Sequence, residues 1–147
     1  MKREGLEIDN MFYAVIDTNV LVSALLSKRD DSATVQVLKS IFSSVIVPLY
    51  TYEILAEYDE VLHRTKFPFR EADIQKTIET IQEYGVYVAN PTPTGEVLLD
   101  SDDLIFYEVV MEKRADDSYL ITGNLRHFPR KTFIVTPAEM MAIIADK

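Results

Sequence analysis

The sequence predicts an α/β fold in which a mainly parallel sheet carries helices on both of its faces. Short apolar, β-branched runs alternate along the chain with longer segments whose apolar residues recur every three or four positions. Strands separated by helical crossovers are typical of parallel sheets, which are buried on both faces. The length of 147 residues and the apolar share of 48% suit one folded domain. We expect this domain at residues 11–147, after a polar and flexible N-terminal tail at residues 1–10.

Two strands and three helices are expected in the first half of the chain. The strands are β-branched runs, and the helices follow capping residues or show apolar positions three and four apart. These signals predict a strand at 12–16, helices at 20–26 and 32–42, a strand at 45–47, and a helix at 52–64 behind Thr51. Pro48 is expected to close the second strand, because proline cannot donate a hydrogen bond to a neighbouring strand.

The second half of the chain continues the alternation. A helix at 71–83 ends at Gly85, before a strand at 86–88 and a proline-rich loop at 90–95. A further helix starts at Asp102 or Asp103 and is followed by strands at 119–122 and 133–136. Pro137 opens the last helix, at 138–145. In a sheet built this way, ligands bind at the carboxyl ends of the strands.

Composition excludes several classes of function. The net charge of −9 argues against binding nucleic acid by bulk charge attraction, because an acidic surface repels phosphates. The chain has no cysteine, so disulfides, thiolate zinc sites and a cysteine nucleophile are excluded. His63 and His127 are too far apart in sequence for a histidine metal motif. No apolar run reaches the roughly 18 residues that cross a bilayer, so we expect a cytoplasmic protein without a membrane partner.

Acidic residues gather where the predicted strands end. Asp17 directly follows the first strand, Glu53 and Glu57 lie one turn apart on the helix after the second, and a further group precedes the helix at 102 or 103: Asp100, Asp102 and Asp103. Each acid alone can be a helix cap or a solvated charge. If three of these segments converge at one sheet edge, their carboxylates repel and favour a bound cation. Hard oxygen ligands suit Mg²⁺ or Mn²⁺, which in turn indicates phosphodiester chemistry.

Four motifs resemble those of PIN-domain proteins, in the same order and at similar spacing. They begin at Val15-Ile16-Asp17-Thr18-Asn19, Tyr52-Glu53-Ile54-Leu55, Asp100-Ser101-Asp102-Asp103 and Tyr119-Leu120-Ile121-Thr122-Gly123-Asn124, and they span about residues 12–136. The branch they resemble is described as the toxin component of toxin–antitoxin systems. The resemblance implies a three-layer α/β/α sandwich with a metal-dependent endoribonuclease site. It also implies a homodimer and a cognate antitoxin protein.

Carried over to this sequence, the resemblance implies that Asp17, Glu53 and Asp103 are the catalytic and metal-binding acids. Asp103 is preferred because it precedes Phe106 by three residues, and Asp100 and Asp102 are second choices. The implied orienting residues, which hydrogen-bond the first acid and the fourth loop, are Thr18, Asn19 and Thr122.

The chain departs from the family at its fourth acid position. Many relatives have Thr-Gly-Asp there, whereas this chain has the neutral Asn124. We therefore expect one tightly bound metal ion, with a second recruited by substrate if at all. Asp116, which precedes the fourth strand together with Asp117, is a candidate replacement ligand and otherwise a solvated loop residue.

Basic residues are few, and two groups follow the acid-bearing segments. Candidate contacts to substrate phosphates are Arg64, Lys66, Arg126 and His127, each of which can equally be an ordinary surface residue. Unpaired bases could stack on Tyr50, Tyr52 or Phe67, although core packing is the commoner role of such residues.

Two alternatives to an RNA-cleaving enzyme stay open. One is a PIN-fold module that binds RNA or protein with weak or lost catalysis, which Asn124 favours. The other is a phosphatase with an aspartyl nucleophile, which needs a second Asp where Asn19 stands.

Overall fold

The computed structural model describes residues 11–146. In that range it has five strands, which are β1 (Phe12–Ile16), β2 (Ile46–Tyr50), β3 (Val86–Tyr87), β4 (Tyr119–Ile121) and β5 (Ile134–Val135). The α-helices of the same range are α1 (Thr18–Leu26), α2 (Ala33–Phe42), α3 (Tyr52–Leu62), α4 (Glu71–Tyr84), α5 (Leu104–Glu112) and α6 (Pro137–Ala145). The predicted tail at residues 1–10 lies outside the described residues.

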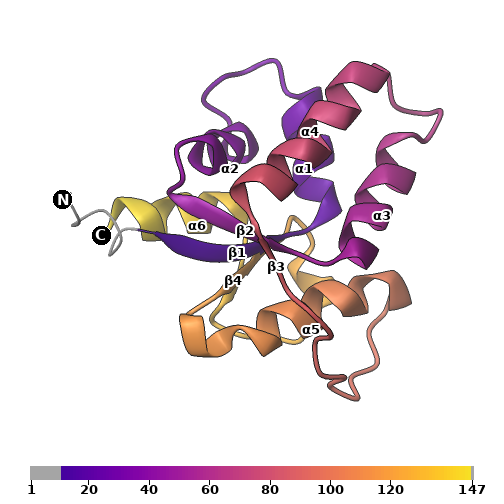
Figure 1. The fold of residues 1–147 in the computed structure, drawn as a ribbon. Coiled ribbons are helices and arrows are strands. Elements are labelled where there is room, and N and C mark those ends of the chain that lie inside the picture. The colour runs from indigo at the N-terminus through magenta and orange to yellow at the C-terminus, as the bar shows by residue number, and fades with distance from the viewer. Residues whose placement is uncertain (1–10, 147) are drawn as a thin grey trace.

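All neighbouring strands of the sheet are parallel, in the order β3-β2-β1-β4-β5. Helices α1, α2 and α4 lie above the sheet in Figure 1 and α5 lies below it, while α6 packs against α2. The predicted three-layer α/β/α arrangement is therefore confirmed. None of the helices in residues 11–146 is long and apolar enough to cross a membrane.

The strand order changes direction at β1. The chain first steps from β1 to β2 and β3, and then returns to β4 on the other side of β1. Crossovers on opposite faces leave the space beyond the carboxyl ends of β1 and β4 open to a ligand. Asp17 and Thr122 are the residues that directly follow these two strands. The backbone N–H of Asp17 donates to the carbonyl of Ile121 at 2.9 Å, which fixes the two strand ends together.

Pro48 lies inside β2, so the prediction that it closes this strand is wrong. It pairs with Ala14 of β1. On the other side of β2, β3 begins only at Val86, opposite Leu49, so no β3 residue depends on a hydrogen bond from position 48. The predicted end of α4 at Gly85 is confirmed, and any side chain there would overlap the carbonyl oxygens of Ile81 and Pro48.

Candidate active site

Asp17 is the buried centre of the candidate site. Its residue is 5% exposed, and its side chain makes no capping hydrogen bond to α1. The Thr122 hydroxyl donates to its Oδ2 at 2.7 Å, and the Asn19 amide donates to the same oxygen at 3.2 Å. Burial raises the pKa of Asp17, and these hydrogen bonds offset only part of that rise. The fold thus holds a carboxylate at a strand end where its negative charge is poorly solvated.

The turn after β4 is fastened to the residues that hold Asp17. The Asn19 side-chain oxygen accepts the backbone N–H of Gly123 at 3.0 Å, and the Thr122 hydroxyl accepts that of Asn124 at 2.9 Å. Asn19 and Thr122 therefore connect the loop after β1 to the loop after β4 through the carboxylate itself. Such supporting contacts fix the orientation of a functional carboxylate.

Thr18 acts on Asp17 through its backbone N–H, whose hydrogen bond lowers the pKa of that carboxyl. Its hydroxyl Oγ1 is buried and makes no hydrogen bond to any other described residue. A buried hydroxyl without a partner costs free energy, so this oxygen has an unmet capacity for a hydrogen bond beside Asp17.

Asp103 is the second carboxylate of the site. It is the last residue of the one-turn helix η2 (Ser101–Asp103), and its side chain is 14% exposed. Its Oδ2 lies 3.2 Å from Nδ1 of His127. Burial and then the charge of Asp17 raise the pKa of Asp103 to about 6, against the hydrogen bond from His127. The two carboxylates are therefore close enough to repel each other.

The other two acids of that segment lie differently. Asp100 accepts the backbone N–H of Asp102 at 2.9 Å and so caps η2. Asp102 is exposed. The geometry thus favours Asp103 over Asp102 as the site carboxylate of this segment.

Helix α3 presents Glu57, not Glu53, to the acidic segment. Glu53 is exposed and makes no hydrogen bond or ion pair with another described residue. Glu57 is half-buried, and its pKa is raised by burial and by the charges of Asp102, Glu60 and Asp100. One sequence signal favours Glu57 over Glu53: Glu57 is adjacent to Tyr58, which belongs to the buried stripe of the helix.

Tyr58 anchors α3 against the end of β1. Its side chain is fully buried, and its hydroxyl donates to the carbonyl of Ile16 at 2.6 Å. Burial raises the pKa of the Tyr58 phenol well above its ordinary value, so it stays a neutral donor. This bond fixes the turn of α3 that carries Glu57 beside the residue preceding Asp17.

The structure does not bring Asp116 into this group, and it places Asn124 at the rim of the group with an exposed side chain. Asp116 precedes β4, whereas Thr122 follows it, so Asp116 lies at the opposite edge of the sheet. Asn124 is exposed, and its backbone makes the contact to Thr122. Among residues 11–146, no three His, Asp or Glu side chains lie close enough together to hold a metal ion. The expected three-carboxylate cage is thus not preformed.

The predicted phosphate contacts lie in different surroundings. Arg64 is paired with Glu60 at 3.0 Å, and Lys66 lies over the ring of Phe67 at 5.2 Å. His127 contacts Asp103 and so belongs to the acidic site. Arg126 is exposed on the one-turn helix η4 (Leu125–His127) and makes no ion pair with another described residue.

The predicted base-stacking residues also separate. Tyr52 is 66% exposed and lies against Tyr87, with ring centroids 4.8 Å apart. Tyr50 contacts the same Tyr87 ring, while Phe67 stacks on Phe69. Tyr52 is therefore not a core residue.

The donor set fits a divalent cation held by two carboxylates. Asp17 and Asp103 supply hard oxygens, and the charge of one raises the pKa of the other, a cost that a bound cation would relieve. Mg²⁺ commonly uses one or two protein carboxylates and completes its shell with water and substrate phosphate.

Comparison with protein families matches residues 13–126 to the PIN domain. This match covers most of the chain, and the protein belongs to the PIN domain family. PIN domains are generally nucleases, a class of hydrolases that typically use divalent metals. Comparisons with curated proteins and with solved structures gave no match.

Proposed function

We propose that this protein is a metal-dependent endoribonuclease that hydrolyses RNA phosphodiester bonds with Mg²⁺ or Mn²⁺ held by Asp17 and Asp103. The observation that carries the proposal is the pair of poorly solvated carboxylates at the switch in strand order. Burial raises the pKa of both, and the charge of Asp17 raises that of Asp103 further. Holding two such groups together costs stability and offers a cation site, which is typical of functional sites.

Each residue of the site has a distinct task in this proposal. Asp17 has one oxygen, Oδ2, occupied by Thr122 and Asn19, so Oδ1 is the oxygen left for ligand binding. His127 holds the Asp103 carboxylate in position. Glu57 adds negative charge from α3 near Asp102 and Asp100, on the helix where the sequence suggested Glu53 as a catalytic and metal-binding acid. When bound, the cation supplies Lewis-acid stabilisation of the charge that develops on the phosphate.

Cleavage of a single-stranded RNA by the purified protein tests the proposal. We expect cleavage with Mg²⁺ or Mn²⁺, none with EDTA, and none for Asp17→Asn. Asp116→Asn makes the same charge change at the opposite edge of the sheet and should cleave like the wild type. Equal cleavage by Asp17→Asn and the wild type would show that Asp17 is not catalytic.

Metal binding supplies a readout that does not depend on cleavage. In calorimetry with Mn²⁺, Asp17→Asn should weaken binding at least tenfold, because one of two carboxylate ligands is lost. Asn124→Asp should strengthen binding, since it restores an acid in the loop after β4. An unchanged affinity in Asn124→Asp would place this position outside the metal site.

A PIN-fold binding module with weak or lost catalysis is the second candidate. The neutral Asn124 and the lack of a preformed three-acid group among residues 11–146 favour it. That function predicts RNA or protein binding without turnover in any divalent metal.

We further propose that the protein acts in the cytoplasm as the toxin of a toxin–antitoxin pair, as a homodimer that an antitoxin inhibits. The resemblance of the four motifs supports this role. Controlled expression should arrest growth and degrade RNA, and Asp17→Asn should do neither. Normal growth with abundant wild-type protein in solution would contradict toxicity.

A further inference from the structure

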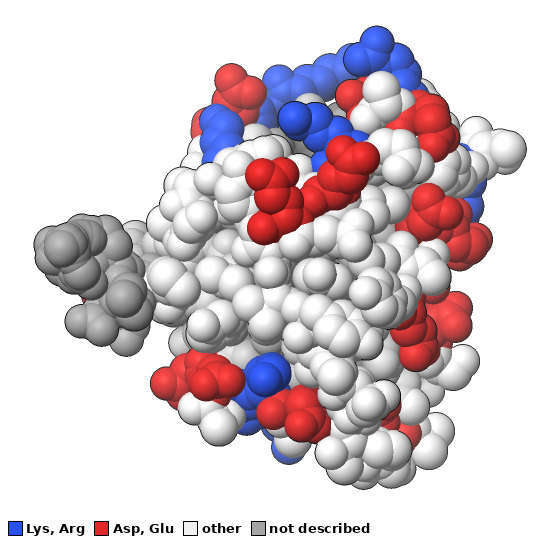
Figure 2. All heavy atoms as spheres, viewed as in Figure 1, with Lys and Arg blue, Asp and Glu red and all other residues white. Residues whose placement is uncertain are grey.

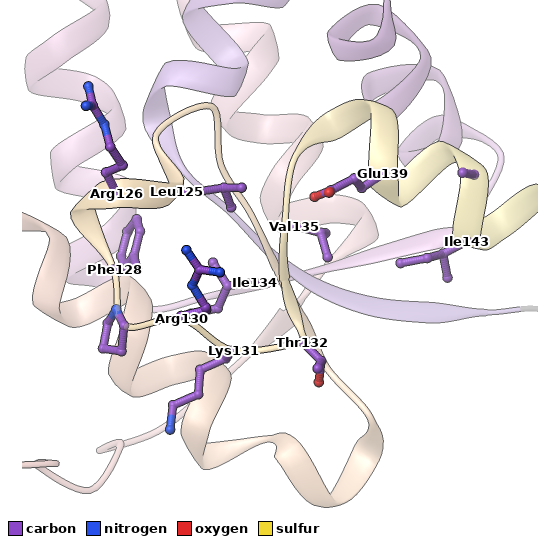
Figure 3. A pocket seen from close by; sticks show the side chains of 12 residues that line it. Leu125, Arg126, Phe128, Arg130, Lys131, Thr132, Ile134, Val135, Glu139 and Ile143 are labelled. Carbon is purple, nitrogen blue, oxygen red and sulfur yellow. The ribbon is translucent and has the colours of Figure 1, made fainter.

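A pocket outside the acidic site lies along β5, one of the two outer strands of the sheet. It has a volume of about 720 Å³ and is enclosed by the segment from Leu125 to Val135 and by α6. Figure 3 shows Arg130 beside Ile134, while Arg126 and Lys131 extend in opposite directions on either side of it. The volume lies in the range of about 300–1,000 Å³ that is usual for ligand pockets.

The pocket combines unpaired positive charge with an apolar wall. Its cations are Arg126, Arg130 and Lys131, and none of them makes an ion pair or a side-chain hydrogen bond within residues 11–146. The acid in the lining, Glu139, is already engaged, because its Oε1 accepts the backbone N–H of Thr136 at 2.8 Å in the capping box of α6. Glu139 keeps its charge, but three cations against this one acid make the pocket net positive in a chain whose net charge is −9.

Lys and Arg side chains also gather elsewhere on this molecule. On the face drawn in Figure 2 they lie mainly along the upper margin, with Asp and Glu beside them. An anionic ligand would be repelled by the acids over much of the surface, and a local group of cations can outweigh that repulsion.

The pocket and the acidic site use adjacent residues of η4. Arg126 lines the pocket, and the next residue, His127, contacts Asp103 at 3.2 Å. A polymer bound at Asp17 and Asp103 would therefore reach the pocket within a short length of chain.

We propose that this pocket binds a nucleotide of single-stranded RNA that flanks the one being cleaved. Its phosphates contact Arg130 and Lys131, and its sugar and base cover the apolar wall formed by Ile134 and Ile143. Cations that contact phosphates beside a surface that contacts bases are the usual combination for single-stranded nucleic acid; aromatic side chains most often form that surface, and here aliphatic ones do. The inference rests on the proposed function for the identity of the polymer.

RNA binding to the full-length protein in EDTA tests the pocket without cleavage. A fluorescent single-stranded RNA is titrated at several salt concentrations against wild type and an Arg130→Ala/Lys131→Ala variant. The control, Lys28→Ala/Lys76→Ala, removes the same charge from two exposed lysines near α1 and on α4. We expect the pocket variant to bind on the order of tenfold more weakly, and the control to bind like the wild type.

Two further measurements separate the pocket from general charge effects. The slope of log affinity against log salt should fall by about 0.7 for each phosphate that the variant no longer neutralises. Ala142→Glu places a carboxylate on the α6 side of the pocket without removing a cation, and it should weaken binding as well.

The outcomes test the nucleotide-binding pocket separately from the proposed nuclease function. Unchanged RNA binding by both pocket variants would refute RNA binding at the pocket, even if the wild type cleaves RNA. Weaker binding by both variants supports the pocket, even if the wild type cleaves nothing in any divalent metal, in which case the proposed function fails alone. Binding of an acidic, leucine-containing peptide that these variants abolish, without binding of RNA, would assign the pocket to a protein partner and overturn the inference.

Discussion

The ionised carboxylate of Asp103 should lower the stability of the metal-free protein at neutral pH, and Asp103→Asn should restore it. The pKa of this carboxyl is about 6 in the folded protein, compared with about 3.9 in an unfolded chain. Between these values the folded state holds the proton more firmly than the unfolded state does. Stability therefore falls as the pH rises from about 4 to about 6, and it stays reduced above that range.

The size of the gain follows from the pKa and the exposure. A shift of about two pKa units corresponds to about 3 kcal/mol. The side chain is still 14% exposed, and solvent screens part of this cost. We therefore expect Asp103→Asn to stabilise the metal-free protein by about 1–2 kcal/mol, or about 3–6 °C in Tm for a domain of this size.

Urea unfolding in EDTA at about pH 7.5 and about pH 4 measures the effect. The gain should be present at the higher pH and absent at the lower, where the carboxyl of the folded protein is protonated. Asp102→Asn is the matched control, because it removes the same charge from an exposed neighbour and should change little. Equal gains at both pH values, or no gain at about pH 7.5, would refute the repulsion argument. Added Mn²⁺ should stabilise the wild type more than Asp103→Asn, because a ligand of the folded state raises its stability.

Three other substitutions test the residues around the site. Tyr58→Phe should lower the free energy of unfolding by about 1–2 kcal/mol, because a buried carbonyl loses its donor; unfolding in urea measures this, and no loss would contradict it. Thr122→Val removes the 2.7 Å hydrogen bond to Asp17 and should reduce RNA cleavage by about 10- to 100-fold, with the pKa of the Asp17 carboxyl moved further upward in a pH–rate profile. Glu57→Gln should reduce cleavage by on the order of tenfold, while Glu53→Gln should leave it unchanged. If Glu53→Gln lost cleavage and Glu57→Gln did not, Glu53 would be the α3 acid that contributes to the site.

Element types were predictable because each depends on neighbours in sequence. Capping by Thr51, the start of the last helix at Pro137, the end of α4 at Gly85 and the apolar periodicity of α3 are local signals, and the structure bears them out. The prediction for Pro48 was wrong because β2 tolerates a proline where no neighbouring strand needs its N–H. That depends on where β3 begins, some 38 residues later, which no local pattern reports.

The site was predictable only in part. Asp17 and Thr122 could be placed because residues that follow parallel strands lie at one edge of the sheet. The choice between Glu53 and Glu57 depended on the rotation of α3, which the bond from Tyr58 to Ile16 sets. The position of Asp116 relative to the site depended on whether it precedes or follows β4, and it precedes this strand.

Local patterns were sufficient for the parallel α/β architecture, the family and the carboxylate at the end of the first strand, because periodicity, caps and strand-end residues act over a few positions. Folding of the whole chain was needed to establish which acids interact, that His127 contacts Asp103, and that three cations line a pocket beside β5. Those results depend on distances between segments far apart in the chain. Burial and charge repulsion act across such distances, and they alone raise the pKa of Asp103 to about 6.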